Sequence, residues 1–156
     1  MRNPMNTSTW KSQVMDLLRS SSCNRCSNFS GTGIIFYRDL VNLPYLQLSA
    51  ADERPNLTQA DSFDIASTLS SVSIMRSPYH DGFHFIDIEH WQIRHLSQNI
   101  SPPIPQGADK QLHGTGARLM SAMLASLLHG IVCVGLVSKE GKIYLFHSGI
   151  DIAREN

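Results

Sequence analysis

The stretch from Ile131 to Val137 has the sequence IVCVGLV, seven residues of which none is polar or charged. A continuous apolar run of this length is typical of a strand that is covered on both faces. A helical pattern over Gln111–His129 precedes it, with apolar side chains on most sides. A hairpin turn over residues 139–142 and a returning strand over Ile143–His147 follow it. The sequence therefore predicts a long helix followed by two neighbouring strands, the first of them buried.

Further elements are predicted on the N-terminal side of this region. Helices are expected over Thr9–Arg19 and Asp61–Met75, where apolar residues recur at helical spacing. Strands are expected where residues are β-branched and aromatic or alternate in polarity, namely over Gly33–Tyr37, Asp81–Glu89 and Gln92–Leu96. These patterns alternate helices with short strands along the chain.

Segments without a periodic pattern separate these elements. Irregular structure is expected for Ser20–Gly33, Leu40–Pro55 and Ser101–Gly107, and the tail Asp151–Asn156 is expected to be frayed. Thr115 is expected to cap the long helix at its N-terminus, and Gly130 is expected to end it. Asp61 or Ser62 can cap the preceding helix in the same way.

Composition limits the kind of partner. The chain has 156 residues, about the length of one domain, and its 13 basic residues balance its 13 acidic ones. Without a basic surplus, a sequence-independent grip on long nucleic acid is not expected, although a small anion needs only a few donors. No apolar stretch approaches a membrane span, Met1–Lys11 lacks the core of a signal peptide, and three cysteines make no disulfide framework. We expect a single soluble domain in the cytoplasm, not bound to a membrane.

The first candidate site is the pair Asp81-Gly82 at the mouth of a predicted strand. A carboxylate beside a glycine can hold a metal ion or a ribose hydroxyl while the backbone approaches the ligand closely. The alternative is an ordinary turn that only starts the strand, because Asp-Gly is a common turn signal.

The second candidate site is the segment HGTGAR, residues 113–118, which opens the long helix. Its small residues let a ligand come near the backbone, and the free N–H groups of a first helical turn, together with Arg118, can hold a phosphate. The alternative is an ordinary helix start with a solvated arginine, because glycines at helix starts are weak phosphate signals.

The two segments together resemble a known family. Asp81-Gly82-Phe83, then Gly114-Thr115-Gly116-Ala117-Arg118, then Val137-Ser138-Lys139-Glu140 follow one another in the order of the motifs of the diadenylate cyclases, which make cyclic di-AMP from two ATP. The resemblance covers about residues 60–149. It implies a mixed central β-sheet with helices on both faces. It also implies that the nucleotide contacts are Asp81, Gly82, Phe83, Gly114, Thr115, Gly116, Arg118, Ser138 and Glu140.

The departures from this family favour binding without catalysis. Two phosphate donors of the family are replaced by Gly116 and Ala117, and a cation, Lys139, stands where the family has a carboxylate. Because phosphoryl transfer rests on positioning and charge neutralisation, these losses should cost several kcal/mol of transition-state stabilisation. The leading hypothesis is a noncatalytic sensor domain that binds a nucleotide or cyclic dinucleotide.

Two alternatives stay open. The chain could be an active nucleotidyl cyclase, in which Asp81 would be the catalytic and metal-holding residue and Mg²⁺ or Mn²⁺ the cofactor. It could also be a scaffold domain with a decayed pocket that binds only another protein. The resemblance further implies self-association, since the family enzymes place two sites face to face.

Weaker patterns indicate metal sites. His80-Asp81 is similar to the metal-binding pair of phosphohydrolases, but it lies at a strand start rather than on a helix. The histidines at 80, 84, 90 and 95 are a possible zinc group, but His80 and His84 would lie about 13 Å apart on one face of an extended strand, too far for one tetrahedral ion without a bend. Cys23 and Cys26 form half of a zinc motif, without a second pair. For all three, solvated or core side chains are the favoured interpretation.

Overall fold

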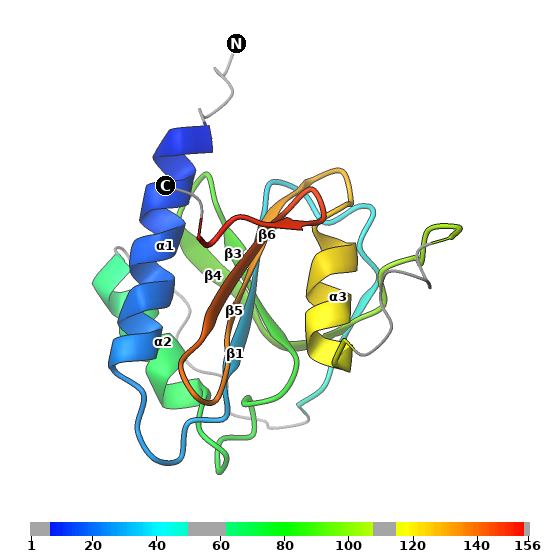
Figure 1. Ribbon diagram of the computed structural model, residues 1–156. Coiled ribbons are helices and arrows are strands. Elements are labelled where there is room, and N and C mark those ends of the chain that lie inside the picture. The colour runs from blue at the N-terminus through cyan, green and yellow to red at the C-terminus, as the bar shows by residue number, and fades with distance from the viewer. Residues whose placement is uncertain (1–6, 50–61, 108–114, 155–156) are drawn as a thin grey trace.

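One seven-stranded mixed sheet organises the chain (Figure 1). The computed structural model describes residues 7–49, 62–107 and 115–154. Within them the elements follow in the order α1 (Thr7–Cys23), β1 (Thr32–Tyr37), β2 (Tyr45–Gln47), α2 (Ser62–Val72), β3 (Phe83–Asp87), β4 (Gln92–Ile100), α3 (Ala117–Ala125), β5 (Ile131–Val137), β6 (Ile143–His147) and β7 (Ile150–Asp151).

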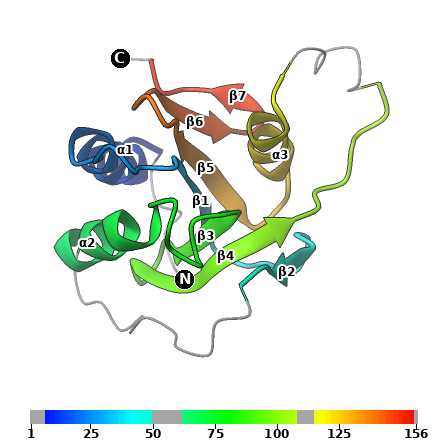
Figure 2. The same cartoon turned by 90° about the horizontal axis from the view of Figure 1, so that it is seen from below.

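The sheet has the strand order β2-β4-β3-β1-β5-β6-β7. Strand β1 pairs parallel with β3 and antiparallel with β5, and the other pairs are antiparallel. Helices α1 and α2 cover one face, and α3 lies on the other (Figure 2). The expected α/β fold, a mixed sheet with helices on both faces, is therefore confirmed.

The stretch IVCVGLV forms β5 with the predicted bounds, and all of its residues are buried. It pairs with β1 on one side and β6 on the other, so its backbone polar groups have partners on both edges. Apolar side chains fill the space above and below it, which is why the strand carries no alternation of polar residues.

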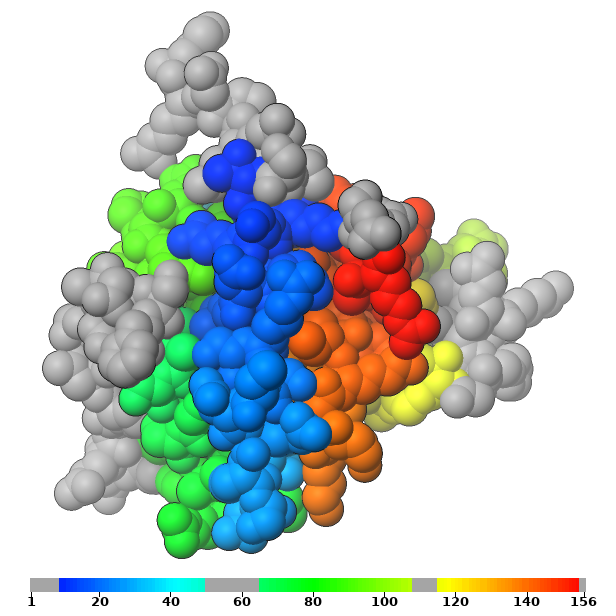
Figure 3. Space-filling model, turned by 60° about the vertical axis from the view of Figure 1, so that its left-hand side comes forward, coloured from blue at the N-terminus to red at the C-terminus, as the bar shows by residue number. Residues whose placement is uncertain are grey.

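Two apolar cores lie on opposite faces of the sheet. Strand β1 contributes to both, because Ile34 and Phe36 pack toward α1 and α2 while Ile35 and Tyr37 pack toward α3. This alternation is the period of two that a strand imposes on its side chains. Helix α1 adds its buried stripe, which includes Trp10, to the first core. Figure 3 shows α1 lying along the surface between the α2 segment and the last strands.

Some predicted irregular segments are ordered. Residues Tyr45–Gln47 form the edge strand β2, which pairs with the end of β4. Three residues are too few for a periodic pattern, so only the partner strand creates this element. Near the C-terminus, β7 pairs with β6 and Ile152 is buried, so the prediction of a frayed tail is wrong for the described residues up to 154. The remaining two residues lie outside the described part.

Helix α3 is shorter than predicted. It begins after Gly116, which is its N-cap in place of Thr115, and it ends at Ser126 rather than at Gly130. Its fully buried residues are Ala122, Leu124 and Ala125 only, so the prediction of burial on most sides is wrong. Gly130 instead lies in the turn directly before β5, and its carbonyl accepts the N–H of Arg38 at 2.8 Å.

Two predictions lie outside the described residues, namely capping by Asp61 and helix over residues 111–114. Helix α1 is longer than predicted at both ends, so the following loop begins only after Cys23. No helix in the described part of the chain combines the length and the apolar character that a membrane crossing needs.

Candidate functional site

The start of α3 opens into a hollow of about 410 Å³. The first backbone bond of the helix runs from the N–H of Met120 to the carbonyl of Gly116, so the N–H groups of residues 117–119 have no partner within the helix. Gly116 supplies no capping side chain. The described residues around the hollow are Ser30, Gly31, Gly116, Ala117, Arg118, Leu119, Leu136, Val137, Ser138, Lys139 and Tyr144.

Arg118 joins the start of α3 to the mouth of β3. Its Nη2 donates to the carbonyl of Gly82 at 3.0 Å, and its Cζ lies 5.9 Å from the centre of the Phe83 ring. Its Nε is buried and has no hydrogen-bond partner among the described residues. Burial lowers the pKa of Arg118, and the charge of Asp81 partly offsets this. The two predicted motifs therefore meet at one guanidinium.

A second, smaller hollow of about 190 Å³ is also lined by Arg118. The described residues around it are Gly82, Phe83, Gln98, Asn99, Ile100, Ala117, Arg118 and Ser121. Because Arg118 and Ala117 line both hollows, the first turn of α3 forms their shared wall.

Gly82 is required by its backbone. Its φ is +76°, and a Cβ at this position would lie 2.5 Å from the carbonyl oxygen of Gln98 on β4. Glycine therefore lets β3 begin close against β4 and presents its own carbonyl to Arg118.

Asp81 does not enter either hollow. Its side chain is 76% exposed, and its Oδ1 lies 3.4 Å from Nε2 of His80. Glu140 is also exposed, and neither acid is among the described residues that line the two hollows. Asp81 directly precedes Gly82, and Glu140 lies in the turn between β5 and β6. Both carboxylates were predicted as nucleotide contacts, but neither belongs to the described lining of either hollow.

The turn between β5 and β6 contributes Ser138 and Lys139 to the larger hollow. Ser138 Oγ accepts the N–H of Lys142 at 3.0 Å, and Ser138 N–H donates to the carbonyl of Lys142 at 2.8 Å. These bonds fix the turn, which leaves the exposed Lys139 at the rim.

The remaining predicted contacts fall at different places. Phe83 is only 4% exposed and belongs to the core on the α3 face. Thr115 is half-buried and precedes the N-cap, without lining a described hollow. Gly114 lies outside the described residues.

Sequence patterns missed several residues that line the larger hollow. Ser30 and Gly31 reach it because β1 pairs with β5, which sets Thr32 opposite Val137. At Gly31, a Cβ would lie 3.0 Å from the carbonyl of Val137 and 3.4 Å from Nη1 of Arg118. Tyr144 reaches it from β6. Only the Ser-Gly pair before a strand could have signalled a turn, and nothing local signals the pairing.

The described side chains offer no cluster of ligands for a metal ion. Among the residues that the structure describes, no three His, Cys, Asp or Glu side chains gather to hold a metal ion. Cys23 and Cys26 are exposed and Cys133 is buried, all as free thiols. Mg²⁺ and Mn²⁺ prefer oxygen ligands, usually with carboxylates, and the described lining of the larger hollow has none. The residues present therefore do not fit the metal that an active cyclase would need.

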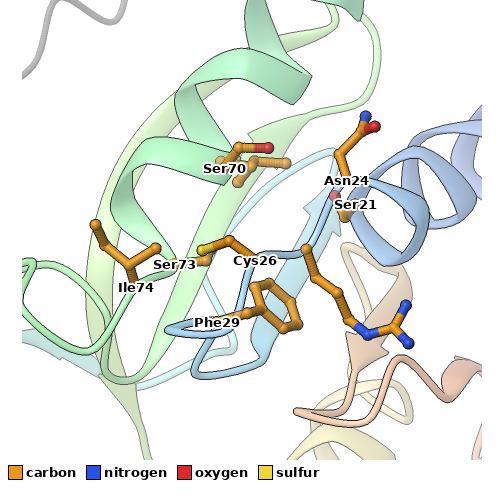
Figure 4. Close-up of a pocket in the computed structure, with 9 residues that line it drawn as sticks. Ser21, Asn24, Cys26, Phe29, Ser70, Ser73 and Ile74 are labelled. Carbon is orange, nitrogen blue, oxygen red and sulfur yellow. The ribbon is translucent and has the colours of Figure 1, made fainter.

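Two other cavities are less suited to a nucleotide. One, between α1, α2 and the loop after α1, has room for about one water molecule at 20 Å³ (Figure 4). The other, of about 480 Å³, is lined by the C-terminal turn after α3, where helix carbonyls disfavour anions, and it holds Asp39 together with Arg38 and two histidines, His129 and His147. An anion is better accommodated at the opposite end of α3.

No protein-family model matches the chain, and no curated protein matches its sequence significantly. The resemblance to the diadenylate cyclases therefore rests on the motif residues of this chain.

Proposed function

We propose that this chain is a regulatory domain that binds a nucleotide or a cyclic dinucleotide without converting it. One observation carries the proposal: the uncapped start of α3, with Arg118 and the nearby Lys139, lines a hollow of about 410 Å³. This volume lies within the range of small-molecule sites.

The chemistry of the hollow suits both parts of a nucleotide. Backbone N–H groups of the first turn of α3 and the guanidinium of Arg118 are donors for a phosphate. The apolar wall of Leu119, Leu136 and Tyr144 offers a surface for a base. The Tyr144 ring already has Lys142 Nζ 4.9 Å from its centre and is stacked with Phe146, so this wall offers a base apolar contact rather than a free aromatic face.

Catalysis is disfavoured by the same geometry. The carboxyl of Asp81, which would act in an active cyclase, is exposed and paired with His80. Lys139 places a cation where the family has an acid. Loss of even one well-placed electrostatic contact costs about 3–4 kcal/mol of transition-state stabilisation, which a binding site tolerates better than a catalyst.

The test is a thermal-shift panel of AMP, ATP, GTP, cyclic di-AMP and cyclic di-GMP. We expect at least one of them to raise the melting temperature, because saturation at about 100 times the dissociation constant adds about 2.7 kcal/mol. No cyclic product should form from ATP or GTP with Mg²⁺ or Mn²⁺. Absence of every shift would contradict the proposal and favour the scaffold alternative.

Variants of Arg118 locate the site. Arg118→Gln should remove the shift, and Arg118→Lys should restore only part of it, since lysine keeps the charge but loses the planar fork of donors. Arg94→Gln, an exposed arginine on β4, is the matched control and should leave the shift intact. Because Arg118 also bonds to Gly82, the melting temperature of each ligand-free variant must be measured first.

A further inference from the structure

The larger hollow has an unbalanced set of charges. Two of its described lining residues, Arg118 and Lys139, are cations, and none is a carboxylate. Asp81, whose charge acts on the Arg118 guanidinium, is 76% exposed, and its Oδ1 lies 3.4 Å from Nε2 of His80. An anion that enters the hollow is therefore neutralised by positive charges of the protein, those of Arg118 and Lys139.

Arg118 strengthens this point. Within the described part of the chain it donates to the carbonyl of Gly82, and its buried Nε has no hydrogen-bond partner there. A guanidinium in partly desolvated surroundings interacts more strongly with an incoming anion than one in water does. Binding of a divalent cation is disfavoured, because Arg118 and Lys139 repel it and no carboxylate in the described lining offsets this repulsion.

We propose that this hollow takes up its phosphate-bearing ligand free of any divalent metal ion, with Arg118 and Lys139 supplying the positive charge that Mg²⁺ supplies at many nucleotide sites. This inference rests on the function proposed above. It favours ligands of low charge that do not carry a metal ion, of which a cyclic dinucleotide with its two phosphodiesters is the best match.

The experiment is a calorimetric titration of the full chain with cyclic di-AMP, and in parallel with AMP, in buffer containing EDTA and in buffer containing MgCl₂. We expect the same affinity in both buffers. Binding that requires Mg²⁺ would overturn this inference and leave the proposed function standing. Absence of binding in both buffers by these probes and by the other nucleotides of the thermal-shift panel would overturn both.

Reversing the charge of Lys139 tests whether this side chain takes the place of a bound metal ion. Lys139→Glu places a carboxylate in the lining, so affinity in EDTA should fall about tenfold, as expected for reversing one charge near the surface. Mg²⁺ should then restore part of it, which a purely structural effect would not do. Arg154→Glu, an exposed reversal near the C-terminus, should bind as the unaltered chain does in both buffers. Unchanged affinity of Lys139→Glu in EDTA would contradict the role of Lys139.

Discussion

Gly82 combines two constraints at a single residue. Its positive φ costs a residue with a side chain about 1–2 kcal/mol, and its missing Cβ leaves room for the carbonyl of Gln98. Gly107 has a similar φ of +85°, but a Cβ there would meet nothing within 4 Å. The two glycines therefore separate backbone strain from steric overlap.

We predict that Gly82→Ala lowers the free energy of unfolding by roughly 2–5 kcal/mol, as the sum of strain and overpacking. Gly107→Ala should lose only the strain, about 1–2 kcal/mol. Urea denaturation of both variants measures the difference. Equal losses would show that β4 moves away from the added methyl group at no cost.

His84 is a titratable group inside the sheet. It is fully buried on β3, and its Nδ1 accepts the N–H of Ser97 at 3.1 Å, which places the ring proton on Nε2. Burial, aided by the charge of Arg118, lowers the pKa of His84 from 6.5 to about 3. The native state therefore holds this ring neutral.

This burial predicts acid sensitivity. Between pH 6.5 and about pH 3 the unfolded chain binds a proton at His84 that the native chain does not bind. The free energy of unfolding should therefore fall as the pH falls through this window, with His84 contributing up to about 1.4 kcal/mol per pH unit. His84→Gln keeps an acceptor but does not titrate, so urea denaturation across this pH range should give a shallower slope. An identical slope would show that His84 is not the group responsible.

At the scale of elements, the contact of α1 with β5 depends on one missing side chain. A Cβ on Gly135 would lie 2.8 Å from Cδ2 of Leu18, which is completely buried in the first core. The glycine inside IVCVGLV thus makes a socket for a leucine of the helix, as glycine in strands does where a neighbour approaches closely.

We predict that Gly135→Ala costs about 1–3 kcal/mol by overpacking and Leu18→Ala about 2–5 kcal/mol by leaving a cavity. The double variant should cost less than the sum, because the alanine methyl fills part of the cavity that Leu18→Ala leaves. A double-mutant cycle in urea measures this coupling. Strict additivity would mean that α1 does not rest on this socket.

Some elements can be predicted from their own residues, and others depend on contacts with distant parts of the chain. Strands β1, β5 and β6 are predicted by their own apolar runs, because consecutive apolar residues indicate a buried strand. The C-terminal end of α3 is not, because Leu127 and Leu128 continue the apolar pattern but their N–H groups bond only three residues back, to Leu124 and Ala125, while Ser126 Oγ donates to the Met123 carbonyl. Strand β2 exists only through its pairing with β4.

At the scale of the whole molecule, both cores share the same strands. Strand β1 buries residues in each core, so losing one core exposes the strands that support the other. We predict one cooperative unfolding transition. Far-ultraviolet circular dichroism and the fluorescence of the buried Trp10 and Trp91 should report the same midpoint in urea. Separate midpoints would contradict the expectation of a single domain.

Some residues of the candidate site can be predicted from the sequence, but their contacts with one another come from the fold. Gly82, Gly116, Arg118 and Ser138 could be named from short motifs, because glycine at a turn and arginine at a helix start have local signatures. No local pattern predicts that Arg118 bonds to Gly82 or that Gly31 lies against Arg118. Nor does any predict that Asp81 is exposed and outside the described lining of both hollows. Their ligand role stays a prediction.

The amino-acid order alone determined the buried strands, the helices between them and the motifs at their ends, since apolar periodicity and turn chemistry act over a few residues. Tertiary structure alone decided that β1 inserts between β3 and β5, parallel to one and antiparallel to the other. Strand partners far apart in the chain are chosen by the packing of both faces at once, and this choice sets Gly31, Arg118 and Lys139 around one hollow.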